Sequence, residues 1–458
     1  MTKTAMRLHL VFCLSISAAL FTGCGEQHNN EQTATYTDTA TVAKTVPAAN
    51  PDTLGFTLPV LDALFYEDGF EAQLKSELQL TDEQVQKLKE VAHASVANLT
   101  EEGPYSGSTR AANAYSREQV KNVIGEEKTN QLLQLVARRY ANGDTDGLLP
   151  TQPNAIPTDT RVIVNIPAFR MDVFQDGKLL KTYRIGIGYP EFPLPIGMRR
   201  AEQIIFNPTW TPPDEPWVKG KVQPGKKVAA GSKLNPLGPI KIPIGLPNLI
   251  HGGKAVSKLG NFASHGCVGL SNQQVQDFAG QLSQLSGTQL TVDSISGFEK
   301  NKTETKNVKL NKAIPVELRY ETIVAENGNL HIYRDVYERG TNTQENLTGV
   351  LAVYGIKYES LSEQEKAAIT QALNAMNQDA KGEPIAGVGN NANATNDTLS
   401  KNSEDTATDK KERTKKGKVT KAVKRQKEIV VPVGALAGKG YPAPVSLDSG
   451  AKSTVTRH

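Results

Sequence analysis

Apolar residues recur every three or four positions between residues 58 and 142, which is the spacing of helices with one buried face. The recurring positions are Leu74, Leu78, Val85, Leu88, Val91, Val120, Ile124, Leu132, Leu135 and Val136. Thr81 is followed three residues later by Gln84, the pattern of a capping box that opens a helix. We therefore expect residues 58–142 to form a small α-helical accessory domain.

The hydrophobic pattern changes to strand-like alternation after residue 157. Phe169, Met171 and Val173 alternate with polar residues, and Asp176-Gly177 then supplies a two-residue hairpin turn. Further short apolar segments lie between loops rich in Pro and Gly, at 203–206, 240–246 and 289–292. This pattern predicts a mostly β domain of the β-sandwich type over residues 158–297.

Two further regions follow this β domain. We expect residues 298–378 to form a C-terminal β extension and helix, with one strand at 315–320 and another from Leu330, joined at an Asn327-Gly328 turn. Residues 379–458 form the basic tail, because 410–427 holds ten Lys and Arg against the single acidic residue Glu412. Such a composition cannot build a core, so we expect this tail to be disordered.

The N-terminus has the pattern of an export signal over residues 1–24. Lys3 and Arg7 precede an apolar run that is too short to span a membrane and ends in Gly23-Cys24. This is a lipoprotein-type signal, in which Cys24 becomes lipidated; ordinary cleavage nearby is the alternative. Gly25 after the cysteine favours the outer membrane, which predicts a lipid-anchored periplasmic protein. Residues 25–57 are polar and form a flexible linker.

Charge excludes one class of partner. The 52 basic and 48 acidic residues leave a net charge of only +4, which is too small to indicate a nucleic-acid-binding protein. The concentrated charge of the tail would instead attract anionic lipids or polysaccharides of the envelope. A solvated tail without any partner explains the same composition equally well.

The candidate catalytic residues lie at and near the segment Ser264-His265-Gly266-Cys267. Cys13 and Cys24 fall in the export signal, so Cys267 is the remaining thiol, and an unpaired thiol in an oxidising compartment usually has a function. A thiolate nucleophile needs a base to take its proton and N–H groups to bind the oxyanion. His251 and His265 are candidate bases. A buried structural cysteine beside incidental histidines is the alternative.

The sequence around this cysteine resembles the L,D-transpeptidase catalytic domain from about residue 160 to residue 297. The signature of that family is His-Gly, a spacer, then Ser/Thr-His-Gly-Cys, which matches His251-Gly252 and residues 264–267. Other segments similar to the family occur in the same order, namely Val164-Asn165-Ile166-Pro167, Pro195-Ile196-Gly197, Asn207-Pro208-Thr209-Trp210-Thr211-Pro212-Pro213 and Asn235-Pro236-Leu237-Gly238-Pro239.

The resemblance implies a cysteine acyltransferase without cofactor or metal that acts on peptidoglycan stem peptides. Cys267 would attack the carbonyl of the third residue of a tetrapeptide, release the terminal D-alanine and form a thioester, and an amine would then take the acyl group. His251 is the implied base, oriented by a carbonyl at or next to Gly252, and His265 has a supporting role. Ser264 would hydrogen-bond within the turn, while the amides of residues 265–267, Gly266 included, would bind the oxyanion.

One position departs from the family pattern. Members commonly carry Arg or Asn two residues after the cysteine, where this chain has Gly269. Either glycine widens the site, or another basic residue such as Lys254 or Lys258 takes over the missing contact. The sequence does not choose between these explanations.

Other functions stay open on the sequence alone. An L,D-carboxypeptidase or endopeptidase would use the same acyl-enzyme with water in place of the amine. A non-catalytic wall-binding lipoprotein would rely on the helical domain and the basic tail. A zinc site is disfavoured, because two His and one Cys lack a fourth local ligand.

Overall fold

The structure is a computed structural model. It describes residues 54–140 except 68, 98 and 100–106, residues 150–245 except 151, 215–217 and 219–221, and residues 247–385 and 419–445. These residues all belong to the compact unit formed by residues 47–458. The expected export signal with Cys24, most of the expected linker and much of the basic tail lie outside them. Within the described part of the chain, no helix is both long and apolar enough to cross a membrane.

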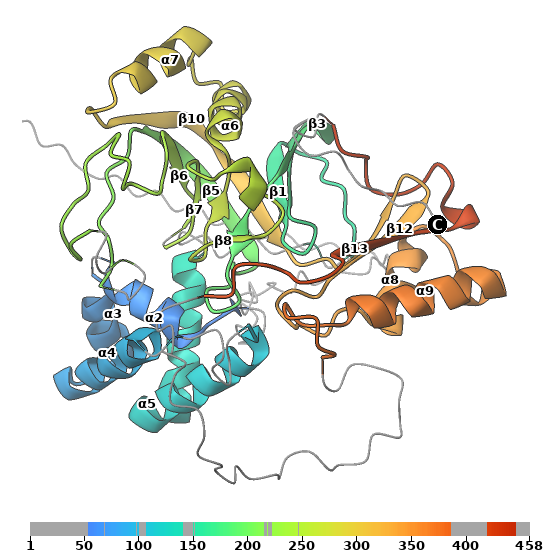
Figure 1. Ribbon diagram of the computed structural model, residues 1–458, viewed down its shortest axis with the longest axis horizontal. Helices are drawn as coiled ribbons and strands as arrows, with labels where there is room; N and C mark the ends of the chain where they lie inside the picture. Colours follow the sequence, from blue (N-terminus) through green and yellow to red (C-terminus); the bar gives the residue numbers. More distant parts are fainter. Residues whose placement is uncertain are drawn as a thin grey trace, which may run out of the picture. The chain divides into compact units, whose positions relative to one another are not determined.

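The helical region packs around its own apolar core. Its helices are α2 (Leu58–Phe65), α3 (Phe70–Leu78), α4 (Asp82–Ala97) and α5 (Thr109–Tyr140), drawn blue to cyan in Figure 1. The predicted capping box is present, since the Gln84 N–H donates to the Thr81 hydroxyl at 3.2 Å and the Thr81 N–H donates to the Gln84 side chain at 3.1 Å. The core also takes in Leu54 and Phe56, so the fold begins within the expected linker.

Eight of the described strands between residues 161 and 319 form a mixed sheet in the order β3-β2-β1-β10-β5-β6-β7-β9. This part of the chain contains the expected catalytic domain and is called the catalytic region below. In chain order its members are β1 (Arg161–Asn165), β2 (Arg170–Gln175), β3 (Lys178–Arg184), β5 (Gly197–Phe206), β6 (Ile240–Pro243), β7 (Leu249–His251), β9 (Val268–Gly269) and β10 (Lys306–Arg319). The pair β4 (Ile187–Gly188) and β8 (Phe262–Ser264) lies beside it. The expected hairpin over 169–187 is β2 and β3.

The two ends of this sheet meet at a glycine pair. Just after β3, Gly186 exchanges both backbone hydrogen bonds with Gly269 of β9, at 2.8 and 2.9 Å. Residues from β1, β3 and β9 contribute to the same apolar core, which α6 (Asn272–Leu285) also joins. The strands therefore curl around a shared core, which agrees with the expected mostly β domain. Alternation alone does not determine which strands pair.

A third layered region follows the catalytic sheet. β11 (Ile323–Glu326) and β12 (Asn329–Tyr333) flank the predicted Asn327-Gly328 turn, and β13 (Glu428–Pro432) adds the third strand described there. Helices α8 (Gln344–Val353) and α9 (Glu363–Met376) pack on these strands in a core of their own (Figure 1). Short 3₁₀ turns complete the described chain at Val256–Lys258, Tyr358–Ser360 and Gly434–Leu436.

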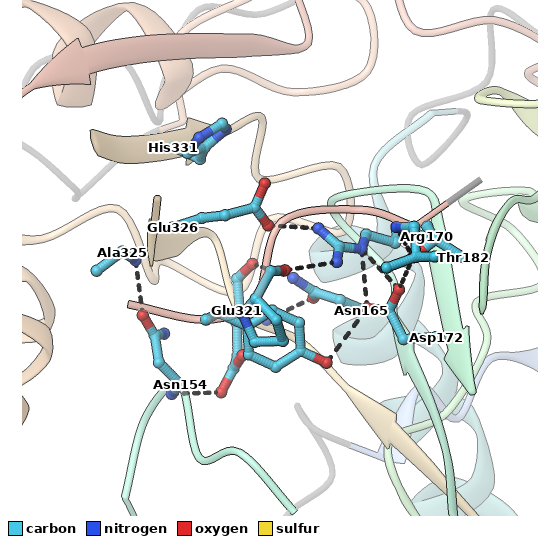
Figure 2. A network of polar contacts seen from close by, with 12 residues as sticks. Asn154, Asn165, Arg170, Asp172, Thr182, Glu321, Ala325, Glu326 and His331 are labelled. Atoms are coloured by element: carbon cyan, nitrogen blue, oxygen red, sulfur yellow. Dashed lines mark hydrogen bonds and ion pairs between the residues drawn. The ribbon is translucent and has the colours of Figure 1, made fainter. Parts of the chain in front are cut away.

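A buried polar network joins β2 of the catalytic sheet to this third region (Figure 2). Arg170 binds Asp172 through Nε at 2.9 Å and also forms an ion pair with Glu326 of β11. Asp172 further accepts hydrogen bonds from Thr182 at 2.6 Å and from Tyr441 at 3.2 Å. Since all the charges in this network have partners, it fixes the two regions against each other.

Two expectations about the C-terminal half were wrong. Residues 315–320 do not begin the extension, because most of them belong to β10, which pairs with β1 and β5 inside the catalytic sheet. Residues 289–292 form no strand and lead into α7 (Val292–Lys300). Helix α6 begins at the N-cap Ser271, which forms a capping box with Gln274.

The expectation of a disordered tail over residues 379–458 was wrong for residues 419–445. This segment supplies β13, and Tyr441 is buried against Phe174. Its partners, β12 and Phe174 among them, lie far earlier in the chain, so a local count of charges could not reveal them. Lys427 illustrates this, because its ammonium donates to the Gly260 carbonyl and the Asn261 side chain, both at 2.5 Å.

Candidate active site

The register of three adjacent strands brings the candidate residues together. Lys241 of β6 pairs with His251 of β7, and His251 pairs with Gly269 of β9. Cys267 lies two residues before Gly269. Cys267 stands in the bend that leads directly into β9, so the pairing of β7 with β9 brings the segment that carries the thiol beside His251. The sheet thus brings the backbone next to Cys267 alongside the strand that ends at His251.

His251 is held in one neutral tautomer. Its Nδ1 lies 2.7 Å from the carbonyl oxygen of Gly252, and because a carbonyl only accepts, Nδ1 carries the proton. Nε2 is therefore left with its lone pair. Burial of the ring, followed by the positive charge of Lys254, lowers the pKa of His251 to about 3. The imidazole is accordingly uncharged at neutral pH, as a proton acceptor must be.

The thiol of Cys267 is also uncharged in the resting site. Part of the residue is exposed, yet the surroundings of the sulfur exclude enough water to raise its pKa above the ordinary value. The backbone of Leu249 and the charges of Lys254 and Lys241 act in the opposite direction without cancelling this effect. If an uncharged thiol is to attack a carbonyl with an uncharged imidazole as its base, the proton has to move as the sulfur attacks.

The turn before Cys267 is preorganised by hydrogen bonds. The Ser264 hydroxyl accepts from the Cys267 N–H at 2.9 Å and donates to the Cys267 carbonyl at 2.5 Å. Gly266 has a φ of +92°, which glycine adopts without strain, and its carbonyl accepts from the buried Asn248 side chain.

These bonds change the expected set of oxyanion donors. The amide of Cys267 is already bound to Ser264, so in this geometry it does not point at a substrate oxygen. The N–H of Gly266 has no acceptor among the described residues and stays in the candidate donor set.

His265 occupies a different environment from His251. Its ring meets the edges of Tyr189 and Phe192 at centroid distances of 5.0 and 4.8 Å, although the residue as a whole is exposed. These surroundings lower its pKa, and the charges of Lys254 and Lys421 add to the effect. Phe192 also belongs to the core of the helical region. His265 therefore connects the turn at residues 264–267 to the core of the helical region through Phe192.

Three residues near the thiol were not identified from the sequence. Lys241 is the lone charged residue in an apolar strand, and that interruption was the signal that could have revealed it. Glu67, between α2 and α3, raises the pKa values of Lys241 and Cys267 by its negative charge. Nothing in the local sequence marked Glu67 or Asn248, since both reach the site through tertiary packing.

The described residues contain no cluster of side chains that could bind a metal ion. Nowhere in them do three His, Cys, Asp or Glu side chains gather in a geometry that could hold an ion. The described groups around Cys267 are a thiol, an uncharged imidazole and two ammonium groups, a set whose chemistry suits acyl transfer.

The comparisons with known proteins bear on this region alone. Residues 159–303 match the family model of the L,D-transpeptidase catalytic domain. None of the curated proteins is similar enough to the chain to count as a match.

Solved structures with similarity to the chain are themselves L,D-transpeptidases. The catalytic domain from E. faecium is 16% identical over 36% of this chain and 100% of that one, with a TM-score of 0.24. An L,D-transpeptidase from Mycobacterium smegmatis is 17% identical over 35% of this chain and 58% of its own, with a TM-score of 0.22. A carbamoyl enzyme formed with avibactam is 16% identical, and the match covers 36% of this chain and 49% of that chain, with a TM-score of 0.22.

The chain therefore spans about half the length of that last structure, and none of these overlaps is close enough to carry an argument of its own. The family model and the signature residues agree on the same segment. Residues 159–303 are an L,D-transpeptidase catalytic domain.

Proposed function

We propose that the protein is an L,D-transpeptidase that acts on peptidoglycan stem tetrapeptides through a thioester on Cys267. The observation that supports the proposal is the strand register, which pairs His251 with Gly269 two residues after Cys267, while the Gly252 carbonyl holds the Nδ1–H tautomer of the imidazole. This tautomer leaves Nε2 as the atom able to accept the thiol proton.

The proposed reaction has two halves. As Nε2 takes the proton, the sulfur attacks the carbonyl carbon of the third residue, and the resulting oxyanion is stabilised by N–H donors of the turn, Gly266 among them. The C–N bond to D-alanine then breaks, and the imidazolium returns the proton to the leaving amine. In the second half an acceptor amine attacks the thioester, loses a proton to His251 and releases the thiol.

The acceptor distinguishes this function from its closest alternative. If water takes the place of the amine, the same acyl-enzyme gives an L,D-carboxypeptidase or endopeptidase. The second half of the reaction depends on which molecule enters beside the thioester, and the chemistry of Cys267 is the same in both.

The test uses purified protein and a disaccharide-tetrapeptide, with products identified by mass spectrometry. A crosslinked dimer supports the transpeptidase, and a tripeptide without dimer supports the hydrolytic alternative. Cys267→Ala is expected to form neither product. Products that persist in Cys267→Ala would contradict the proposed nucleophile.

We also propose that the enzyme works in the periplasm, anchored to the outer membrane through a lipid on Cys24. The support is the sequence pattern of residues 1–24, with its basic start, apolar run and Gly23-Cys24. Membrane fractionation of the full-length protein tests this directly. Cys24→Ala should move the protein out of the membrane fraction, and equal membrane association of both forms would contradict the anchor.

A further inference from the structure

Gly269, the position that departs from the family pattern, leaves a space that another side chain fills. A methyl group at this position would lie 2.8 Å from Cγ and 2.9 Å from Cε of Lys254. Both distances are far shorter than carbon–carbon contacts allow, so the aliphatic stem of Lys254 occupies the volume in which a side chain at 269 would begin.

We propose that Lys254 is the carboxylate-binding cation of this active site, and that Gly269 is the residue that makes room for it. The inference rests on the proposed function and adds a recognition residue to it. Of the two lysines that the sequence offered as replacements, the structure selects Lys254. Lys258 is exposed on the 3₁₀ turn Val256–Lys258, and its side chain is not among the atoms nearest to position 269.

The backbone around Lys254 is fixed on both sides. The Lys254 N–H donates to the Leu270 carbonyl at 3.1 Å, directly beside β9. The preceding residue, Gly253, has a φ of +81° and donates its N–H to the side chain of Asn272 at 2.8 Å. The backbone that carries Lys254 is therefore already ordered, which reduces the entropy lost when a ligand binds to the lysine.

The charge of Lys254 reaches the reacting groups. It lowers the pKa values of Cys267, His251 and His265, and burial lowers its own pKa. Within the described ranges its ammonium forms no ion pair and no side-chain hydrogen bond. An ammonium that is partly removed from water and lacks a counter-charge is costly, and an anionic ligand would offset that cost.

Lys241 differs from Lys254 in this respect. Its charge is opposed by Glu67 as well as by Cys267, and the charge of Glu67 raises its pKa. For Lys254 the group with this effect is Cys267, which carries a negative charge only when its thiolate forms. Lys254 is accordingly the better placed of the two to receive a substrate carboxylate next to the sulfur.

The first experiment tests the cation without requiring any transpeptidase activity. The rate of alkylation of Cys267 is measured with anionic iodoacetate and with neutral iodoacetamide, and the ratio of the two rates is compared between variants. Lys254→Met keeps the stem over Gly269 and removes the charge. We expect it to lower the iodoacetate-to-iodoacetamide ratio by about tenfold.

Lys258→Met is the matched control and is expected to leave the ratio unchanged. An unchanged ratio in Lys254→Met, or an equal fall in Lys258→Met, would overturn the assignment. Because the effect of Lys254 on the thiol pKa acts on both reagents alike, the ratio reports the attraction of the anion alone.

A double variant tests the spatial exchange between positions 254 and 269. Lys254→Ser combined with Gly269→Arg returns a cation to the position that carries Arg or Asn in other family members. The ratio should recover to within about threefold of the starting protein. A folded double variant that keeps the low ratio of Lys254→Met would refute the idea that these two positions share one space.

Matched donor peptides then identify which carboxylate is recognised. One tetrapeptide carries an amide in place of its terminal carboxylate, and a second has its internal carboxylate amidated instead. In the unmodified protein, one of the two amidated peptides should acylate Cys267 more slowly than the other. In Lys254→Met, this difference in acylation rate should disappear. Equal discrimination in both proteins would exclude Lys254 as the recognition residue. Failure of all donors to acylate the starting protein would count against the proposed function, while the alkylation ratio would still decide the role of Lys254.

Discussion

At the residue scale, the site combines a protonated thiol with an uncharged imidazole. Burial raises the pKa of Cys267 and lowers that of His251 to about 3, so an ion pair between them is disfavoured before substrate binds. The charged groups that act on the sulfur are Lys254, Lys241 and Glu67. The enzyme would then generate its thiolate during attack, with the attacked carbonyl present to accept the charge.

This arrangement predicts a simple pH dependence for Cys267. Only the thiolate reacts with iodoacetamide, and its fraction rises tenfold per pH unit below the thiol pKa, so the rate should climb by about tenfold per unit from roughly pH 6 to pH 9. His251 adds no step in that range because it loses its proton near pH 3. A plateau that begins below pH 7 would instead reveal a preformed thiolate–imidazolium pair.

At the element scale, the polar network between β2 and β11 is expected to contribute measurably to the free energy of unfolding. Arg170 lies between Asp172 and Glu326, and all three residues are buried. Replacing it by methionine leaves two carboxylates without their counter-charge, which should lower the free energy of unfolding by about 3–5 kcal/mol. Urea denaturation measures this change.

A surface ion pair provides the control for that variant. Lys75 and Asp82 approach to 2.6 Å, but both side chains are largely exposed to water. Lys75→Met should leave the urea midpoint where it is, because water screens such a pair. Equal losses in the two variants would show that burial of the network is not what matters.

The elements also show what the sequence could and could not predict. Alternation and turn residues located the hairpin around Asp176-Gly177, and the Thr81–Gln84 capping box located the start of α4, because both signals are local. β13 and β10 were misassigned because their partners are distant in the chain. The cysteine and histidine were found as a motif, whereas the placement of Lys254 over Gly269 required the tertiary structure.

At the scale of the whole molecule, the helical region touches the catalytic region next to the site. The Thr57 hydroxyl donates to the Glu191 carbonyl at 2.7 Å, and the adjacent Phe192 links the helical core to the ring of His265. Glu67 brings a negative charge from the same region toward Cys267. The helical region thereby contributes to the electrostatics of the thiol.

Removing the charge of Glu67 should therefore make the thiol more reactive. Glu67→Gln is expected to lower the pKa of Cys267 and to speed alkylation by iodoacetamide at pH 7 by about two- to threefold, a small effect because the carboxylate is partly solvated. Stopped-flow or quench kinetics measure the rate. A slower reaction in Glu67→Gln would mean that its negative charge does not oppose thiolate formation.

The most direct test of the whole account is the mass of the intact protein after mixing with a tetrapeptide donor. We predict an adduct equal to the donor minus D-alanine, located on Cys267 by peptide mapping and missing in Cys267→Ala. An adduct on another residue, or one that survives in Cys267→Ala, would contradict the claim that this cysteine carries the acyl group.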